Sequence, residues 1–164
     1  MSAKKLVFFS ILIAQAMVLS FIEQLIPLPV AIPGAKLGLA NLVTLIVLYK
    51  FGFKPAFSIL LGRIFLISFL FGNFAMLWYS LAGGLLALLT MALSRKFFSM
   101  IGVSILGALM HNVGQVCVAA LVIENLKIAY YLPVLLVIAI PTGLFIGITG
   151  RYLLSAIDKI KLEL

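Results

Sequence analysis

The chain has 164 residues, of which 65% are apolar and 10% charged, and its mean hydropathy is +1.33. Soluble domains are about 45–50% apolar and about 25% charged, and disordered chains are poor in apolar residues, so both classes are excluded. The apolar runs are continuous rather than alternating, which excludes a transmembrane β-barrel. The composition therefore predicts an all-α integral membrane protein with a single transmembrane domain over residues 1–164.

Six apolar segments predict six transmembrane helices, because a spanning helix needs about 20 residues. In chain order they cover residues 6–26, 37–49, 56–71, 76–93, 100–123 and 130–154. The second segment is short, and we expect its ends to extend into an interface. Three of the six prolines lie between the first two segments, in residues 27–34. Because proline fixes φ and removes a backbone donor, this stretch predicts a stiff outer loop, which either covers the site or only connects two helices.

The basic residues collect at alternate segment ends. With the N-terminus inside, two of the twelve lie at outer ends (Lys36 and Lys127), Arg63 lies within a span, and nine lie at inner ends: Lys4, Lys5, Lys50, Lys54, Arg95, Lys96, Arg151, Lys159 and Lys161. Basic residues in short loops mark the cytoplasmic side of a membrane. The pattern predicts a multi-pass protein of the cell membrane with both termini cytoplasmic, and it explains the net charge of +8 without a nucleic-acid partner.

Several polar residues fall inside the predicted spans or at their ends, where such residues are costly and usually functional. They are Glu23, Asn41, Arg63, Asn73, His111, Asn112 and Gln115. His111 and Gln115 lie one turn apart on one helix face. These groups either line an outward-opening cavity that binds a ligand or only bond neighbouring helices, and Asn41 by itself is more typical of a helix-packing amide.

The sequence contains no recognisable catalytic, metal-binding or nucleotide-binding motif. Magnesium-dependent diphosphate chemistry needs clustered carboxylates, and the four acidic residues form no such cluster. A lone His111 and a lone Cys117 do not make a zinc site, and a G-x-x-x-x-G-K-[ST] loop is absent. We therefore predict a protein that is not an enzyme and has no metal or cofactor, and whose transport, if energised, draws on another subunit.

Pairs of small residues predict where helices approach closely. Gly143 and Gly147 form one such pair in the sixth segment, and Ser10 and Ala14 form another in the cytoplasmic half of the first. Internal packing is the simpler interpretation of such pairs. The pair in the first segment is also a candidate docking surface for a partner subunit.

Several motifs resemble the heptaprenyl diphosphate synthase component I family, also called the Gx transporter family. They are P-G-A-K-L-G-L-A-N at residues 33–41, F-G-N at 71–73, M-H-N-V-G-Q at 110–115, Glu23, Arg63, and Ser80 with Gly83 and Gly84. The resemblance covers nearly the whole chain. That family in turn is similar to the substrate-binding S components of energy-coupling-factor (ECF) transporters.

The resemblance implies a six-helix bundle with both termini inside and an outward-opening site beneath the first outer loop. It also implies partners, namely a transmembrane T subunit and two cytoplasmic ATPase subunits. Small residues on the first helix are the expected docking face, although this chain has Ser10 and Ala14 where two alanines are usual. The enzyme name fits less well, because the aspartates of prenyltransferases are missing.

We therefore predict an S component that captures a small vitamin-like, quinone-precursor or isoprenoid-related molecule. Its binding residues are predicted to be Glu23, Lys36, Asn41, Arg63, Asn73, His111, Asn112 and Gln115. Arg63 and Lys36, set against Glu23, favour a ligand with an acidic group. The alternative is a non-catalytic membrane component of a heptaprenyl diphosphate synthase. A purely structural membrane protein is disfavoured by the charged and polar residues within its spans.

Overall fold

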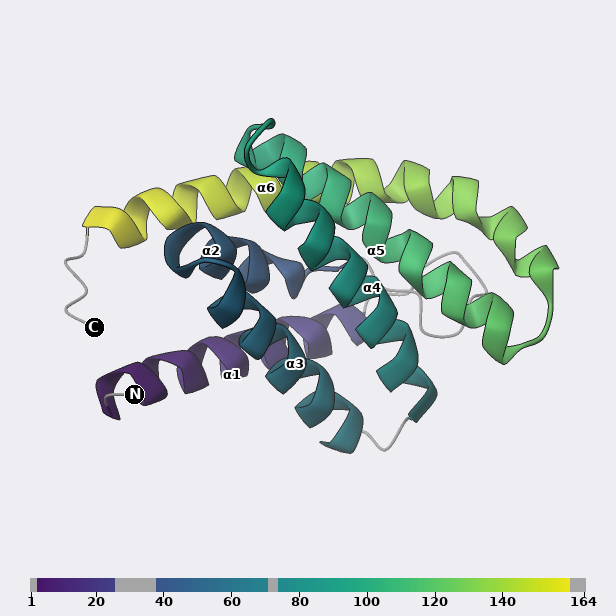
Figure 1. The fold of residues 1–164 in the computed structure, drawn as a ribbon, viewed down its shortest axis with the longest axis horizontal. Coiled ribbons are helices and arrows are strands. Elements are labelled where there is room, and N and C mark those ends of the chain that lie inside the picture. Colours follow the sequence, from purple (N-terminus) through teal and green to yellow (C-terminus); the bar gives the residue numbers. More distant parts are fainter. Residues whose placement is uncertain (1–2, 26–37, 71–73, 160–164) are drawn as a thin grey trace.

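The structure is a computed structural model that describes residues 3–25, 38–70 and 74–159. These residues form helices joined by short turns (Figure 1). In chain order the helices are α1 (Ala3–Leu25), α2 (Asn41–Phe51), α3 (Phe53–Leu70), α4 (Phe74–Ser94), α5 (Met100–Val122), the 3₁₀ helix η1 (Leu126–Tyr131) and α6 (Leu132–Lys159). The all-helical form that the composition predicts is confirmed for the described part of the chain.

Five helical segments are long and apolar enough to cross a membrane, the last of them formed by η1 and α6 together. The second predicted span is helix α2, which has 11 residues. At 1.5 Å per residue it is about 16 Å long, against a hydrocarbon layer of about 30 Å. The described structure therefore contains five helices of spanning length and one short apolar helix, and the number of crossings and their orientation stay predictions.

The helix bounds differ from the predicted spans mainly around α2. This helix begins at Asn41 rather than at residue 37, because Gly38 has a φ of +85° and Leu39 and Ala40 form a turn. Only Gly52, with a φ of +89°, separates α2 from α3. The predicted inner connection at residues 50–54 is thus a one-residue turn, and α3 starts three residues earlier than its predicted span.

Helices α4, α5 and α6 pack closely, and glycines make this approach possible. A Cβ atom on Gly114 of α5 would lie 2.7 Å from the carbonyl oxygen of Ala82 in α4. Cβ atoms on Gly143 and Gly147 of α6 would lie 2.6 and 2.7 Å from the Cα atoms of Ile105 and Ile101 in α5. The small pair predicted in the sixth segment is therefore a site of internal packing.

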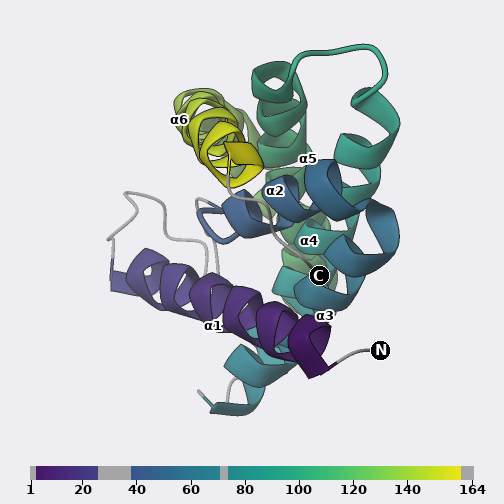
Figure 2. The same ribbon diagram turned by 90° about the vertical axis from the view of Figure 1, so that its left-hand side faces the viewer.

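Helix α2 lies in the interior, between α1 on one side and α6 on the other (Figure 2). Seven of its residues are buried: Asn41, Val43, Thr44, Leu45, Ile46, Val47 and Leu48. Helix α1 starts and helix α6 ends on the same side of the molecule (Figure 1). On that side, an ion pair between Lys50 and Asp158 joins the ends of α2 and α6.

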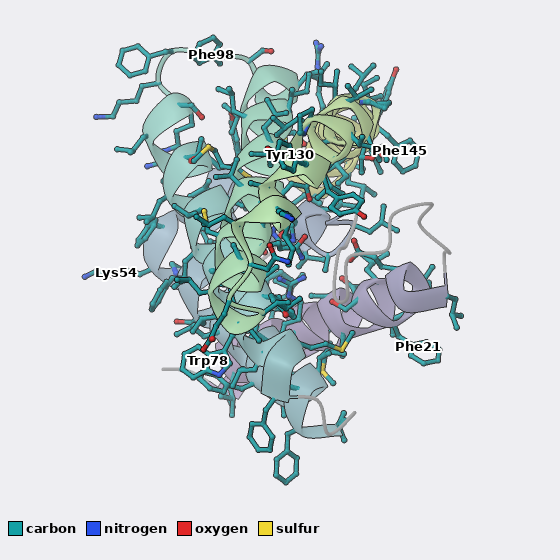
Figure 3. The ribbon with its side chains drawn as sticks, turned by 90° about the vertical axis from the view of Figure 1, so that its right-hand side faces the viewer. Phe21, Lys54, Trp78, Phe98, Tyr130 and Phe145 are labelled. Carbon is teal, nitrogen blue, oxygen red and sulfur yellow. The ribbon has the colours of Figure 1, made fainter. Side chains whose placement is uncertain are left out.

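Large apolar side chains cover the outside of the bundle. Phe21, Trp78, Phe98, Tyr130 and Phe145 project outward from it (Figure 3). An exposed surface of this kind is what a protein presents to lipid, because hydrocarbon tails solvate apolar side chains. The structure agrees with a multi-pass membrane protein.

Candidate functional site

A small polar cavity lies where α1, α3, α4 and α5 meet the turn before α2. Its polar lining comes from Ser20 and Glu23 of α1, Arg63 of α3, Ser80 of α4 and His111 of α5, together with Gly38. All five of these polar side chains are buried. The structure thus brings together Glu23, Arg63 and His111, which the sequence predicts as site residues although they are distant along the chain.

Arg63 contributes a buried positive charge to the lining of this cavity. Its side chain is 6% exposed, and its Nη1 atom donates a hydrogen bond to Ser20 Oγ over 3.3 Å. The Nε atom of Arg63 has no hydrogen-bond partner among the described residues. The carboxylate of Glu23 lines the same cavity. A buried guanidinium needs such an opposite charge, because removing it from water without one is strongly unfavourable.

Glu23 also holds the turn that precedes α2. Its Oε1 atom accepts hydrogen bonds from the backbone N–H groups of Gly38 and Leu39. The first residue before α2, Ala40, provides no side-chain cap. A carboxylate from α1 therefore satisfies backbone donors in the turn just before α2, close to the helix end whose dipole favours negative charge.

Asn41, His111 and Gln115 lie next to this arrangement. A Cβ atom on Gly38 would lie 2.9 Å from Asn41 Nδ2 and 3.8 Å from His111 Cδ2, so both polar side chains lie close to Gly38. A Cβ atom on Gly83 of α4 would lie 3.0 Å from both Gln115 Cγ and His111 Nδ1. Because Gly38 and Gly83 have no side chains, there is room beside the cavity for the side chains of Asn41, His111 and Gln115.

Two of the predicted site residues lie outside the described residues, and a third contacts a neighbouring helix instead of the cavity. Lys36 and Asn73 are not among the residues that the structure describes. Asn112 donates from Nδ2 to the carbonyl oxygen of Leu135 in α6 over 2.9 Å. It does not appear in the lining of the polar cavity. Asn112 therefore joins α5 to α6, which is the helix-packing alternative that the sequence left open.

Ser20 and Ser80 line the cavity but were not singled out as binding residues from the sequence. A serine in an apolar helix commonly bonds to the backbone one turn before it, so its presence alone carries little information. Ser20 lies three residues before Glu23, on the same face of α1. That spacing is the signal that could have identified it.

The polar cavity is small. Its volume is about 10 Å³, which is room for about one water molecule. Pockets that enclose drug-sized ligands have volumes of about 300–1,000 Å³. Within the described residues, no three His, Cys, Asp or Glu side chains come together, so these residues offer no metal-binding cluster. In this conformation the cavity is too small to enclose a vitamin-sized ligand.

Two larger apolar grooves flank α1. The first, which we call the α1–α3 groove, has a volume of about 390 Å³ and is lined by Ser10 of α1 together with residues of α3. The second, which we call the α1–α2–α6 groove, has a volume of about 660 Å³ and is lined by Ala14 of α1 together with residues of α2 and α6. Ser10 and Ala14 are both exposed. The predicted docking pair therefore lies on the outward ridge of α1, between the two grooves.

Comparison with known proteins identifies one family. A sequence profile of the family described as heptaprenyl diphosphate synthase component I matches residues 12–153. The match includes all the cavity-lining residues and confirms the resemblance seen in the motifs. Neither the curated proteins nor the solved structures contain a match to the chain.

Proposed function

The chain belongs to the heptaprenyl diphosphate synthase component I family, and we propose that it is the substrate-binding S component of an ECF-type importer. It captures a small molecule with an acidic group, of the vitamin-like, quinone-precursor or isoprenoid-related kind. The protein spans the cell membrane six times with both termini in the cytoplasm. The short helix α2 then forms the second crossing together with the turn before it.

One observation carries this proposal, namely the buried charge of Arg63 in a cavity built by several helices. An arginine used only for helix packing also needs polar partners, but its polar atoms are then usually all hydrogen-bonded within the protein. Here Ser20, Glu23, Ser80 and His111 line the same cavity. A guanidinium binds a carboxylate or phosphate through two parallel hydrogen bonds, and its Nε atom lacks a partner among the described residues. A ligand acid is a chemically suitable partner.

The import partners follow from the same proposal. The sequence has no phosphate-binding loop for ATP, so two cytoplasmic ATPase subunits and a transmembrane T subunit supply the energy. The ridge of α1 at Ser10 and Ala14 docks on the T subunit, because small exposed side chains let another helix approach closely. The lipid bilayer is the remaining partner, because it surrounds the apolar outer surface of the helices.

Native mass spectrometry of the gently purified protein tests this proposal. We expect a co-purified acidic small molecule, and we expect a T subunit and ATPase subunits in the complex when all are expressed together. The Arg63→Met variant should lose the small molecule, whereas Arg151→Met is a control because Arg151 is exposed at the far end of α6. A complex that forms with no small molecule, or a small molecule retained by Arg63→Met, would contradict the assigned site.

A second candidate function is supported by the description of the family, which names a component of a heptaprenyl diphosphate synthase. In that case the chain is a non-catalytic membrane subunit that accompanies a prenyltransferase. Co-expression with a prenyltransferase subunit distinguishes the two candidates. A stable complex and an increased prenyltransferase activity support the second, whereas co-purification with a T subunit supports the first.

A further inference from the structure

Helix α6 contains an uninterrupted apolar run that ends at Arg151. Residues 132–150 include no charged residue. At 1.5 Å per residue this run is about 28 Å long, close to the hydrocarbon thickness of about 30 Å. The length and composition of α6 allow it to cross a membrane. Such a crossing places Arg151 where the hydrocarbon ends and the lipid headgroups begin.

A groove opens at this point of α6, which we call the α5–α6 groove. Helix α6 continues past the first residues of α5 (Figure 1), and the groove lies beside their contact. Its volume is about 520 Å³, and it is lined by Ile101 of α5 and by Ile148, Arg151, Tyr152 and Ser155 of α6. It shares no lining residue with the Arg63 cavity. What the groove binds is therefore a separate question from the proposed function.

The positive charge of Arg151 is unpaired within the described part of the chain. Arg151 is exposed, and the ion pair that the described residues form joins Lys50 to Asp158. Asp158 is also the one carboxylate that the structure describes on α6. Ser155 donates its hydroxyl hydrogen to the carbonyl oxygen of Tyr152. The side chains of Arg151 and Tyr152 are therefore the donors that the groove offers to a ligand.

The face of α6 that carries the groove changes from apolar to polar along the helix. Ile148 and Leu144 lie one and two turns before Arg151 and are 39% and 43% exposed. Hydrocarbon solvates these two side chains, whereas tyrosine and arginine are typical of the headgroup level. An arginine also binds a phosphate through two parallel hydrogen bonds. This order of groups matches a phospholipid, with acyl chains along the apolar part and a phosphate at the polar end.

We infer that the α5–α6 groove binds an anionic phospholipid of the bilayer, whose phosphate contacts the guanidinium of Arg151 and the hydroxyl of Tyr152. A zwitterionic headgroup also carries a cation, and the lining of the groove offers no carboxylate to it. A lipid with a net negative charge is favoured for this reason, as it is at other basic pockets between transmembrane helices. The apolar side chains of Ile101 and Ile148 favour a lipid over a free phosphate ion.

Native mass spectrometry of the protein in a mild detergent measures the binding of one lipid at a time. Phosphatidylglycerol is the anionic probe, and phosphatidylcholine with the same acyl chains is the zwitterionic comparison. Arg151→Gln removes the charge in the groove. Lys96→Gln is its matched control, because Lys96 lies in the exposed turn before α5 and does not line the groove. Ile148→Trp fills the groove, and Val137→Trp is its control, since Val137 is 68% exposed on α6 outside the groove.

We expect the wild type to bind phosphatidylglycerol more tightly than phosphatidylcholine. Arg151→Gln should raise the Kd for phosphatidylglycerol about tenfold, because it removes a charge-assisted pair of hydrogen bonds. Lys96→Gln should change that Kd by about twofold at most, as expected for an exposed charge without a built site. Ile148→Trp should weaken both lipids and Val137→Trp neither, and melting curves check that all four variants fold.

Four results would overturn the inference. Equal affinity of the wild type for the two lipids would remove the preference for negative charge. Equal effects of Arg151→Gln and Lys96→Gln would reduce the binding to general attraction between opposite charges. Displacement of phosphatidylglycerol by excess inorganic phosphate would assign the groove to a free anion. Unchanged lipid binding by Arg151→Gln, together with a loss of T-subunit co-purification, would assign it to a partner protein.

Discussion

Glu23 on α1 accepts a hydrogen bond from the backbone N–H of Gly38, fifteen residues later in the chain. This contact joins the end of the first helix to the start of the second, and it places a carboxylate in the cavity that contains Arg63. One side chain thereby supports the backbone and balances a buried charge. A change at Glu23 therefore affects both the backbone of the turn before α2 and the charge of the cavity.

The first prediction concerns Glu23. Glu23→Ala leaves the buried backbone N–H of Gly38 without its acceptor, and a buried donor left without a partner costs about 1–3 kcal/mol. It also removes the negative charge from the cavity that Arg63 lines. Glu23→Gln keeps an acceptor oxygen for the amide and should cost less. Melting temperatures in detergent compare the two variants with the wild type. Equal melting temperatures for Ala and Gln would show that the backbone contact contributes little.

The second prediction concerns Arg63 and the ligand. Arg63→Lys keeps the charge but cannot form two parallel hydrogen bonds to an acid, so affinity should fall by about tenfold or more, about 1.4 kcal/mol. His111→Ala and Gln115→Ala should cost less, because a neutral hydrogen bond contributes about 1 kcal/mol. The Kd is measured in nanodiscs alongside a melting curve. Normal binding with a much lower melting temperature would make Arg63 a structural residue only.

The third prediction compares two glycines with positive φ. At Gly38 (φ +85°), an added Cβ would lie 2.9 Å from Asn41 Nδ2, whereas at Gly52 (φ +89°) nothing lies within 4 Å. Gly52→Ala should therefore cost only the backbone strain of a side chain in a glycine-only conformation, about 1–3 kcal/mol. Gly38→Ala adds a steric conflict inside the site and should destabilise more. Thermal unfolding measures both, and the reverse order would contradict this view of the site.

A fourth prediction concerns the orientation of the chain in the membrane. The Lys96→Cys variant is made in a chain that also carries Cys117→Ser. Its new thiol should be protected from a membrane-impermeant thiol reagent applied to intact cells. A cysteine at Lys127, at the opposite end of α5, should react. Both should react after permeabilisation, which is the control for accessibility. Labelling of the Lys96 position from outside would reverse the predicted topology.

The fifth prediction tests the docking ridge. Ala14→Trp and Ser10→Trp should weaken co-purification with a T subunit, because a bulky side chain prevents close helix approach. Phe145→Trp is a control on α6, where a large exposed side chain is already present. Survival of the complex in both α1 variants would place the docking surface elsewhere on the bundle.

Composition and periodicity by themselves determined that the chain forms apolar helices, because continuous apolar runs near 20 residues admit little else in a membrane. They also singled out Glu23, Arg63 and His111, since charged and polar groups within such runs are too costly to be incidental. Even the close approach at Gly143 and Gly147 followed from spacing alone.

Only the tertiary structure decided which polar residues meet. Residue spacing places Asn112 next to His111, yet the one bonds to α6 while the other lines the cavity. The start of α2 was likewise not predictable, because it depends on Gly38 and on a carboxylate from α1. The size of the cavity and the grooves beside α1 depend on how side chains from separate helices fill the space between them. Such distances are set by packing across the bundle, and local sequence carries no record of them.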